Sequence, residues 1–196
     1  MKSALLIVDM QNDFVLPTAP ACVAGALATV PRVREVLDCF RSGKLPVFHV
    51  YREYRADGSD IEITRRPAFM AGARFVVPGT PGAEFVRELE PVAGEYRIVK
   101  RCFSAFFATE LDLVLRRLGV DRILLCGTQY PHCIRATAYD AISHGYPVTV
   151  VTDATSAATP EVAAANIRDM ESIGIRCAAF ADVRRDLEGT PLARAV

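Results

Sequence analysis

The chain has 196 residues, of which 51% are hydrophobic and 23% are charged, and this ordinary globular composition excludes intrinsic disorder over most of its length. A chain of this length fits one domain whose core needs no disulfide or metal for stability. Lysines and arginines total 23, as do aspartates and glutamates, so the net charge is zero. This balance argues against nucleic acid or an anionic membrane surface as a partner.

No apolar run approaches the roughly 18 residues that a membrane-spanning helix needs. The first apolar run ends at Asp9, too early for the apolar region of a signal peptide. We therefore expect a cytoplasmic protein that makes no membrane contact. Cysteines stay reduced in that compartment and the chain has no Cys-x-x-Cys pair, so we expect free thiols at Cys22, Cys39, Cys102, Cys126, Cys133 and Cys177.

Short apolar runs alternate with helix-length amphipathic stretches along the chain. The runs typical of buried strands are residues 4–9, 45–51, 97–100, 122–127, 147–152 and 175–180. The stretches that predict helices are residues 30–43, with Pro31 at the start, 109–118, 133–144 and 160–173. Strands that are apolar on both faces and separated by helices indicate a parallel sheet covered on both sides.

Two segments depart from this alternation. Residues 52–81 are rich in glycine and proline and are too long for an ordinary connection, so they form either a functional loop or a lid. Residues 184–196 show no clear period. We therefore divide the chain into a domain, residues 1–183, and a C-terminal tail, residues 184–196, which frays or reaches a partner subunit.

Ligands of an open parallel sheet bind outside the carboxyl ends of its strands, and three reactive residues fall at such ends. Asp9 follows the first strand, either as a turn-capping carboxylate or as a general base. Lys100 ends the third strand, either as a solvated lysine or as a cation beside a developing negative charge. Cys133 opens the helix after the fourth strand. The positive end of the helix dipole lowers the pKa of a thiol at this position. The role of nucleophile is therefore favoured over that of a small buried apolar residue.

Together these residues make a complete set for acyl transfer. Cys133 would attack a carbonyl carbon, and Asp9 would take the thiol proton, return it to a leaving amine and later activate water. Lys100 would steady the negative charges. Their convergence is inferred from the fold, because spacing alone cannot show that they touch.

Several motifs in the same order resemble the isochorismatase-like cysteine hydrolase superfamily, which includes nicotinamidases and N-carbamoyl amidohydrolases. The resemblance covers residues 4–183, nearly the whole chain. The motifs are LIVDMQNDF at 6–14, PGTPGAEF at 78–85, VKRCFSAF at 99–106, LLCGT at 124–128, CIRATAYDA at 133–141 and VTDA at 151–154.

This resemblance implies a Rossmann-like, three-layer α/β/α fold with a six-stranded, mainly parallel sheet. It implies that Asp9, Lys100 and Cys133 form the catalytic triad. It also implies a cis peptide bond before Gln129, an oxyanion hole made by the backbone N–H groups of Gln129 and Cys133, and a pocket wall at Phe14. A homo-oligomer, dimer or tetramer, is expected on the same ground.

The region after the second strand departs from the nicotinamidase pattern. Nicotinamidases carry an Asp-x-His pair and a second histidine there, and these residues hold a metal; this chain reads HVYREYR at 49–55. We therefore expect no metal and no other cofactor, and nicotinamide itself is placed in doubt. The three histidines are His49, expected to be packed in its strand, His132, expected to line the pocket, and His144, expected to cap a helix.

Other residues near the expected pocket are candidates for substrate binding. Arg52 and Arg55 follow the second strand and either belong to a solvated loop or clamp a substrate carboxylate or carbamoyl oxygen. Before the nucleophile the chain has Tyr130, Pro131 and His132, where relatives often have smaller polar residues. Tyr130 could narrow the pocket or bind the ligand.

The function predicted first is a cysteine-dependent hydrolase of a small amide or N-carbamoyl compound that forms a thioester. A second hypothesis is an isochorismatase-type vinyl-ether hydrolase with Asp9 as general acid, although the retained Cys133 favours attack on a carbonyl. A third is a non-catalytic binding module with a vestigial site, and a peroxide-sensing thiolate is a lesser possibility. A small-molecule substrate is the partner expected for either enzyme.

Overall fold

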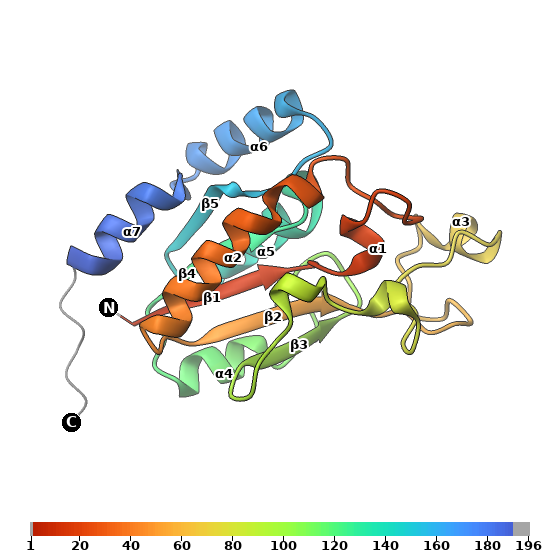
Figure 1. Ribbon diagram of the computed structural model, residues 1–196, viewed down its shortest axis with the longest axis horizontal. Helices are drawn as coiled ribbons and strands as arrows, with labels where there is room; N and C mark the ends of the chain where they lie inside the picture. Colours follow the sequence, from red (N-terminus) through yellow and green to blue (C-terminus); the bar gives the residue numbers. More distant parts are fainter. Residues whose placement is uncertain (1, 190–196) are drawn as a thin grey trace.

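The computed structural model of the protein describes residues 2–189, which form one sheet with helices on both faces (Figure 1). All strand pairs are parallel, in the order β3-β2-β1-β4-β5-β6. This confirms the predicted α/β/α fold. The strands are β1 (Ser3–Val8), β2 (Val47–Arg52), β3 (Tyr96–Lys100), β4 (Arg122–Gly127), β5 (Val148–Thr155) and β6 (Arg176–Ala178). The helices are α1 (Asn12–Val15), α2 (Ala26–Ser42), α3 (Arg66–Met70), α4 (Leu111–Arg117), α5 (Arg135–Ser143), α6 (Pro160–Ser172) and α7 (Phe180–Gly189).

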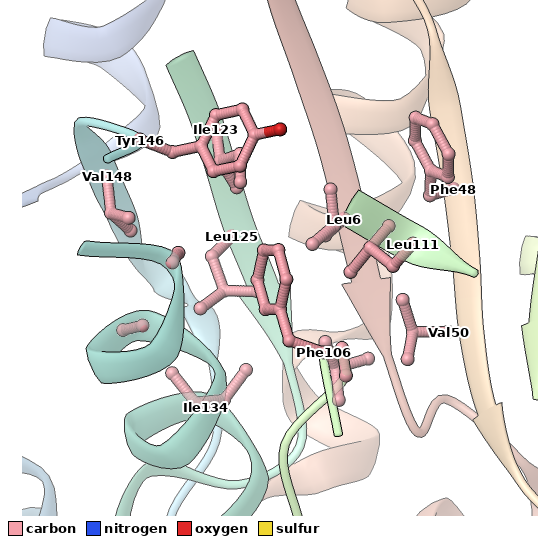
Figure 2. Close-up of a cluster of buried hydrophobic side chains, with 14 of the residues drawn as sticks. Leu6, Phe48, Val50, Phe106, Leu111, Ile123, Leu125, Ile134, Tyr146 and Val148 are labelled. Atoms are coloured by element: carbon pink, nitrogen blue, oxygen red, sulfur yellow. The ribbon is translucent and has the colours of Figure 1, made fainter. Parts of the chain in front are cut away.

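Each face of the sheet carries its own apolar cluster, because successive side chains of a strand point to opposite faces. Leu6 and Leu125 belong to the α5-side cluster, which packs the sheet against α4, α5 and α6 (Figure 2). Their neighbours Leu5 and Leu124 belong to the α2-side cluster, which packs the other face against α2 and α7. Burial on both faces explains the unbroken apolar runs of the strands.

The boundaries of some elements differ from those predicted. Helix α2 begins at Ala26, so Pro31 lies in its second turn rather than at its start. Strand β6 has only three residues, because the chain turns into α7 at Phe180. Phe180 and Val183 of α7 pack in the α2-side cluster.

Helix α7 runs past the predicted boundary between domain and tail. It continues through residues 184–189, and Leu187 packs against the α2-side cluster. Residues 190–196 lie outside the described residues. Within 2–189, no helix is both long and apolar enough to cross a membrane.

The long segment between β2 and β3 is held against the body of the protein. It contains α3 and two 3-10 turns, Pro81–Ala83 and Arg87–Leu89. A third apolar cluster joins this segment to α1, and its buried members are Phe14, Tyr54, Ile61, Phe69 and Val76. Packing of these aromatic side chains positions the residues that precede α3.

The end of β4 needs a glycine, and we predict that Gly127→Ala destabilises the protein by more than about 2 kcal/mol. Gly127 has a φ of +112°, and an added Cβ would lie 2.2 Å from the carbonyl oxygen of Val8. Gly145 is a matched control, because its φ is +86° but, among residues 2–189 other than its chain neighbours, no atom lies within 4 Å of an added Cβ. Urea unfolding of both alanine variants measures the difference. Equal losses of stability in the two variants would show that the close approach of Gly127 to β1 does not add to the destabilisation.

Candidate active site

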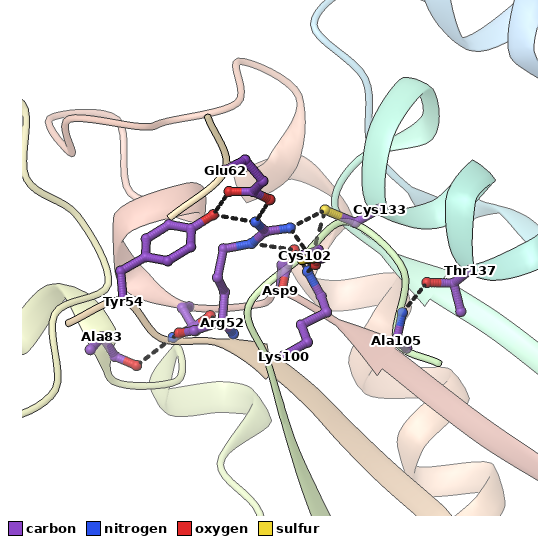
Figure 3. A network of polar contacts seen from close by, with 11 residues as sticks. Asp9, Arg52, Tyr54, Glu62, Ala83, Lys100, Cys102, Ala105, Cys133 and Thr137 are labelled. Carbon is purple, nitrogen blue, oxygen red and sulfur yellow. Dashed lines mark hydrogen bonds and ion pairs between the residues drawn. The ribbon is translucent and has the colours of Figure 1, made fainter. Parts of the chain in front are cut away.

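Three side chains meet at the carboxyl edge of the sheet, near the point where the strand order reverses between β1 and β4 (Figure 3). Asp9 follows β1, Lys100 ends β3, and Cys133 lies in the turn after β4. Nζ of Lys100 lies 2.8 Å from Oδ2 of Asp9 and 3.5 Å from Sγ of Cys133. All three side chains are buried. The structure therefore brings together the three residues predicted as a catalytic set.

The backbone of Asp9 is unusual, with a φ of +53°. This left-handed conformation is rare for residues other than glycine and is concentrated at functional sites. One carboxylate oxygen of Asp9 accepts the hydrogen bond from Lys100. The other, Oδ1, is buried and has no hydrogen-bond partner among residues 2–189. An acceptor is thus available beside the sulfur.

The electrostatic surroundings of Cys133 disfavour ionisation of its thiol. Burial, followed by the neighbouring Asp9 carboxylate, raises the pKa of Cys133, and Lys100 and Arg52 oppose this by lowering it. The net result is a pKa above the ordinary value. Because the thiolate is the nucleophilic form, this thiol needs a base at the moment of attack, and the Asp9 carboxylate is in place for that role.

Arg52 is a second cation at the sulfur, in a role that differs from the predicted substrate clamp. The side chain is 0% exposed, and Nη2 donates to Sγ of Cys133 at 3.2 Å and to the carbonyl oxygen of Cys102 at 3.0 Å. Nη1 is occupied by groups of the protein as well. Arg55, the other predicted clamp residue, has a side chain 74% exposed and lies near Asp60.

Two residues that the sequence did not single out hold the far side of this guanidinium. Nη1 of Arg52 donates to the hydroxyl of Tyr54 and to Oε1 of Glu62, and Tyr54 donates to Oε2 of Glu62. Burial opposes ionisation of Glu62, but Arg52 and Tyr54 hold its pKa below the ordinary value. The only signal that could have found Glu62 is the need of a buried arginine for a carboxylate partner.

Gln11 is a further residue that sequence reasoning missed. Its side-chain amide donates to the carbonyl oxygens of Arg52 and Ala83, and its Oε1 accepts from the backbone N–H of Arg52, each at 2.8 Å. The side chain is fully buried. The pairing of β2 with β1 ends at Val50, so these bonds take its place on that side of Arg52 and fix the position of this residue.

The turn between β4 and α5 carries the nucleophile. The Thr128–Gln129 peptide bond is cis, as the resemblance implied. A π-helical turn, Tyr130–Ile134, follows and places Cys133 two residues before the start of α5. Tyr130 is buried in the α5-side cluster and its hydroxyl donates to the carbonyl oxygen of Thr152, so the structure places it in the core rather than at a pocket wall.

Comparison with known proteins agrees with this architecture. The sequence matches the isochorismatase domain over residues 3–184. The chain belongs to the isochorismatase family. A probable inactive nicotinamidase of Arabidopsis thaliana is 44% identical, over 89% of this chain and 91% of that protein. Maleamate amidohydrolase of Pseudomonas putida is 33% identical, over 87% and 80%. The crystal structure of an isochorismatase family protein from Desulfovibrio vulgaris has a TM-score of 0.92 and 53% identity, over 95% of this chain and 98% of that one.

The remaining predicted pocket residues of this isochorismatase-family chain lie at different places. Phe14 is buried in the third apolar cluster, edge-on to Phe75. His132 is exposed, with its ring centroid 5.5 Å from that of Phe103, and both residues line a hollow of about 330 Å³. Gln129 is partly buried. That these three residues contact substrate stays a prediction.

The residues after β2 do not fit the metal site of nicotinamidases within the isochorismatase family. Arg52 ends β2 with a buried guanidinium, and a cation has no lone pair for a metal ion. His49 points elsewhere: its Nε2 lies 2.8 Å from Oε2 of Glu95, which also pairs with Arg41. Among residues 2–189, no group of three histidine, cysteine or acidic side chains is arranged to hold a metal ion.

Proposed function

We propose that this chain is a cysteine-dependent hydrolase that cleaves the C–N bond of a small amide or N-carbamoyl compound through a thioester on Cys133. The observation that carries the proposal is the contact of Lys100 with both Asp9 and Cys133 in a buried site. A nucleophile, a base and a cation within hydrogen-bond reach of one another are the parts that acyl transfer needs.

The reaction follows from these positions. Sγ of Cys133 attacks the carbonyl carbon while the thiol proton passes to Asp9, and the carbonyl oxygen becomes an oxyanion. When the tetrahedral intermediate collapses, the C–N bond breaks and Asp9 gives its proton to the leaving nitrogen, so ammonia or an amine departs. Water then attacks the thioester and loses its proton to Asp9. The C–S bond breaks, the acid is released, and the proton returns to the sulfur of Cys133.

The oxyanion requires donors, and the turn after β4 offers them. The backbone N–H of Gln129 has no backbone acceptor among the described residues. We propose that it binds the developing oxyanion together with the N–H of Cys133, which lies in the π-helical turn that follows. Donors held by a rigid turn stabilise such a charge without reorganising during the reaction.

Relatives of the chain support the class of bond. The match to maleamate amidohydrolase covers most of both proteins, and the name of that relative describes hydrolysis of an amide. A second candidate, a member without hydrolase activity, is favoured by the name of the Arabidopsis relative, a probable inactive nicotinamidase. The buried triad, in which Lys100 contacts both Asp9 and Cys133, supports the enzyme, because three ionisable side chains at one buried site are costly to maintain without a use.

Turnover of a panel of small amides and N-carbamoyl acids tests the proposal. We expect ammonia or amine release by the wild type without added metal, and a loss of roughly 10³-fold or more in Cys133→Ala. Intact mass measurement of rapidly quenched enzyme should show the acyl group on Cys133.

Cys102→Ala is the matched control, because Cys102 adjoins the site and contributes only its backbone carbonyl to Lys100 and Arg52. It should keep wild-type turnover. Turnover that survives in Cys133→Ala would exclude the thioester route. An absence of turnover on every compound, with no acyl group on the enzyme, would favour the member without hydrolase activity.

A further inference from the structure

The guanidinium of Arg52 lies between the nucleophile and the long segment that joins β2 to β3 (Figure 3). On one side, Nη2 contacts Sγ of Cys133 at 3.2 Å. On the other, Nη1 contacts Tyr54 and Glu62. Because Arg52 is fully buried, its charge is stable only with compensating anions close by. The placement of this cation at the sulfur therefore depends on what holds its far side.

Glu62 supplies that compensation from the long segment. Its side chain is 9% exposed, whereas the next residue, Ile63, is 86% exposed. The chain thus turns Glu62 inward at a point where its neighbour faces outward. Tyr54 fixes the second carboxylate oxygen, and its own ring packs against Phe69 and Phe75. The three polar groups form a closed triangle, which leaves the guanidinium little freedom to rotate.

A second carboxylate competes for the same guanidinium. Nε of Arg52 is buried, has no hydrogen-bond partner in the part of the chain that the structure describes, and lies 3.8 Å from Oδ2 of Asp9. If the hold of Glu62 were lost, Asp9 would be the nearest carboxylate to Arg52. A bidentate pair between these two residues would draw Nη2 away from the sulfur and would occupy the base.

We propose that Glu62 is a positioning residue, supported by Tyr54, which holds the guanidinium of Arg52 against Sγ of Cys133 and away from Asp9. The segment between β2 and β3 thereby completes the nucleophilic site. Arg52 acts directly, because it donates to the reacting sulfur and stabilises the negative charge that forms there. The catalytic role of this positioning rests on the proposed function, but the positioning of Arg52 itself can be tested without a substrate.

The pH dependence of Cys133 alkylation by iodoacetamide is the test, followed by peptide mass analysis so that the other thiols do not interfere. The groups that set this dependence are Asp9 after β1, Arg52 on β2 and Lys100 on β3. In Glu62→Gln we expect the midpoint of alkylation to rise by about one pH unit or more, because the sulfur loses the N–H donor and cation at 3.2 Å. The midpoint, unlike the maximal rate, does not depend on easier access of the reagent.

The midpoint of alkylation is expected to fall instead of rise if Glu62 acts only through its charge. Removal of a nearby negative charge with Arg52 still in place would favour the thiolate and lower the midpoint. Either a lower or an unchanged midpoint would therefore overturn the positioning role. Tyr54→Phe, which keeps the ring and removes only the hydroxyl, should shift the midpoint upward by a smaller amount, and it gives an independent test if Glu62→Gln folds poorly.

Asp60→Asn is the matched control. Asp60 lies two residues before Glu62 in the same segment and pairs with Arg101 at 2.9 Å, outside the site. Its replacement should leave the midpoint and turnover unchanged. The two proposals fail separately. Turnover that survives in Cys133→Ala would reject the cysteine-dependent hydrolase, whereas Cys133-dependent turnover with no upward shift in Glu62→Gln would reject only the positioning role.

Discussion

Asp9→Asn is expected to lower turnover by roughly 10³-fold and, at the same time, to speed alkylation of Cys133 at neutral pH. The two effects have opposite signs because Asp9 acts on two different steps. Its carboxylate raises the pKa of Cys133, so its removal leaves Lys100 and Arg52 to stabilise the thiolate. Turnover nevertheless falls, because no group remains to protonate the leaving nitrogen or to activate water.

Steady-state amide hydrolysis and the alkylation rate at pH 7, measured on the same preparations, check this expectation. Parallel losses of both would mean that Asp9 serves only to form the thiolate or to maintain the fold. Cys133→Ala distinguishes the thioester route from vinyl-ether hydrolysis, because the second needs an acid at position 9 but does not need the thiol. Turnover of a vinyl-ether substrate that Cys133→Ala keeps and Asp9→Asn loses would therefore indicate ether hydrolysis by a general acid.

The fold and the triad could be predicted from sequence for one physical reason. Residues that end neighbouring parallel strands share an edge of the sheet, so Asp9, Lys100 and Cys133 had to lie on the same side of the molecule. Strand order decides whether they touch, and β1 lies between β2 and β4 in the structure. Lys100 reaches Asp9 across β2, and this contact could not be predicted from the spacing of the two residues in the sequence.

Orientation and irregular structure were beyond sequence reasoning. Tyr130 precedes the nucleophile by three residues, but the π-helical turn directs its ring into the core. Arg52 was identified as a site residue, whereas its partner Glu62 lies ten residues further on in a segment without a period. Pairing across such a segment depends on the packing of aromatic residues, here Phe69 and Phe75 around Tyr54.

Lys100→Met is expected to lower the free energy of unfolding by about 3 kcal/mol or more and to slow the alkylation of Cys133 at neutral pH. Lys100 is fully buried, and its ammonium group is 2.8 Å from Asp9. Methionine fills a similar volume but leaves the carboxylate without its closest cation. The pKa of Cys133 should rise further, because one of the two cations that lower it is gone.

A double variant distinguishes a lost ion pair from a packing defect. Asp9→Asn combined with Lys100→Met removes both charges, so it should regain much of the stability that Lys100→Met loses, while turnover stays abolished. Lys44→Met is the control, because Lys44 is exposed and its replacement should change stability by less than about 0.5 kcal/mol. Urea unfolding of the wild type, Asp9→Asn, Lys100→Met and the double variant gives the coupling energy between the two residues. If the losses of the two single variants simply add in the double variant, the Asp9–Lys100 contact contributes no pairing energy, and Lys100 would act at Cys133 alone.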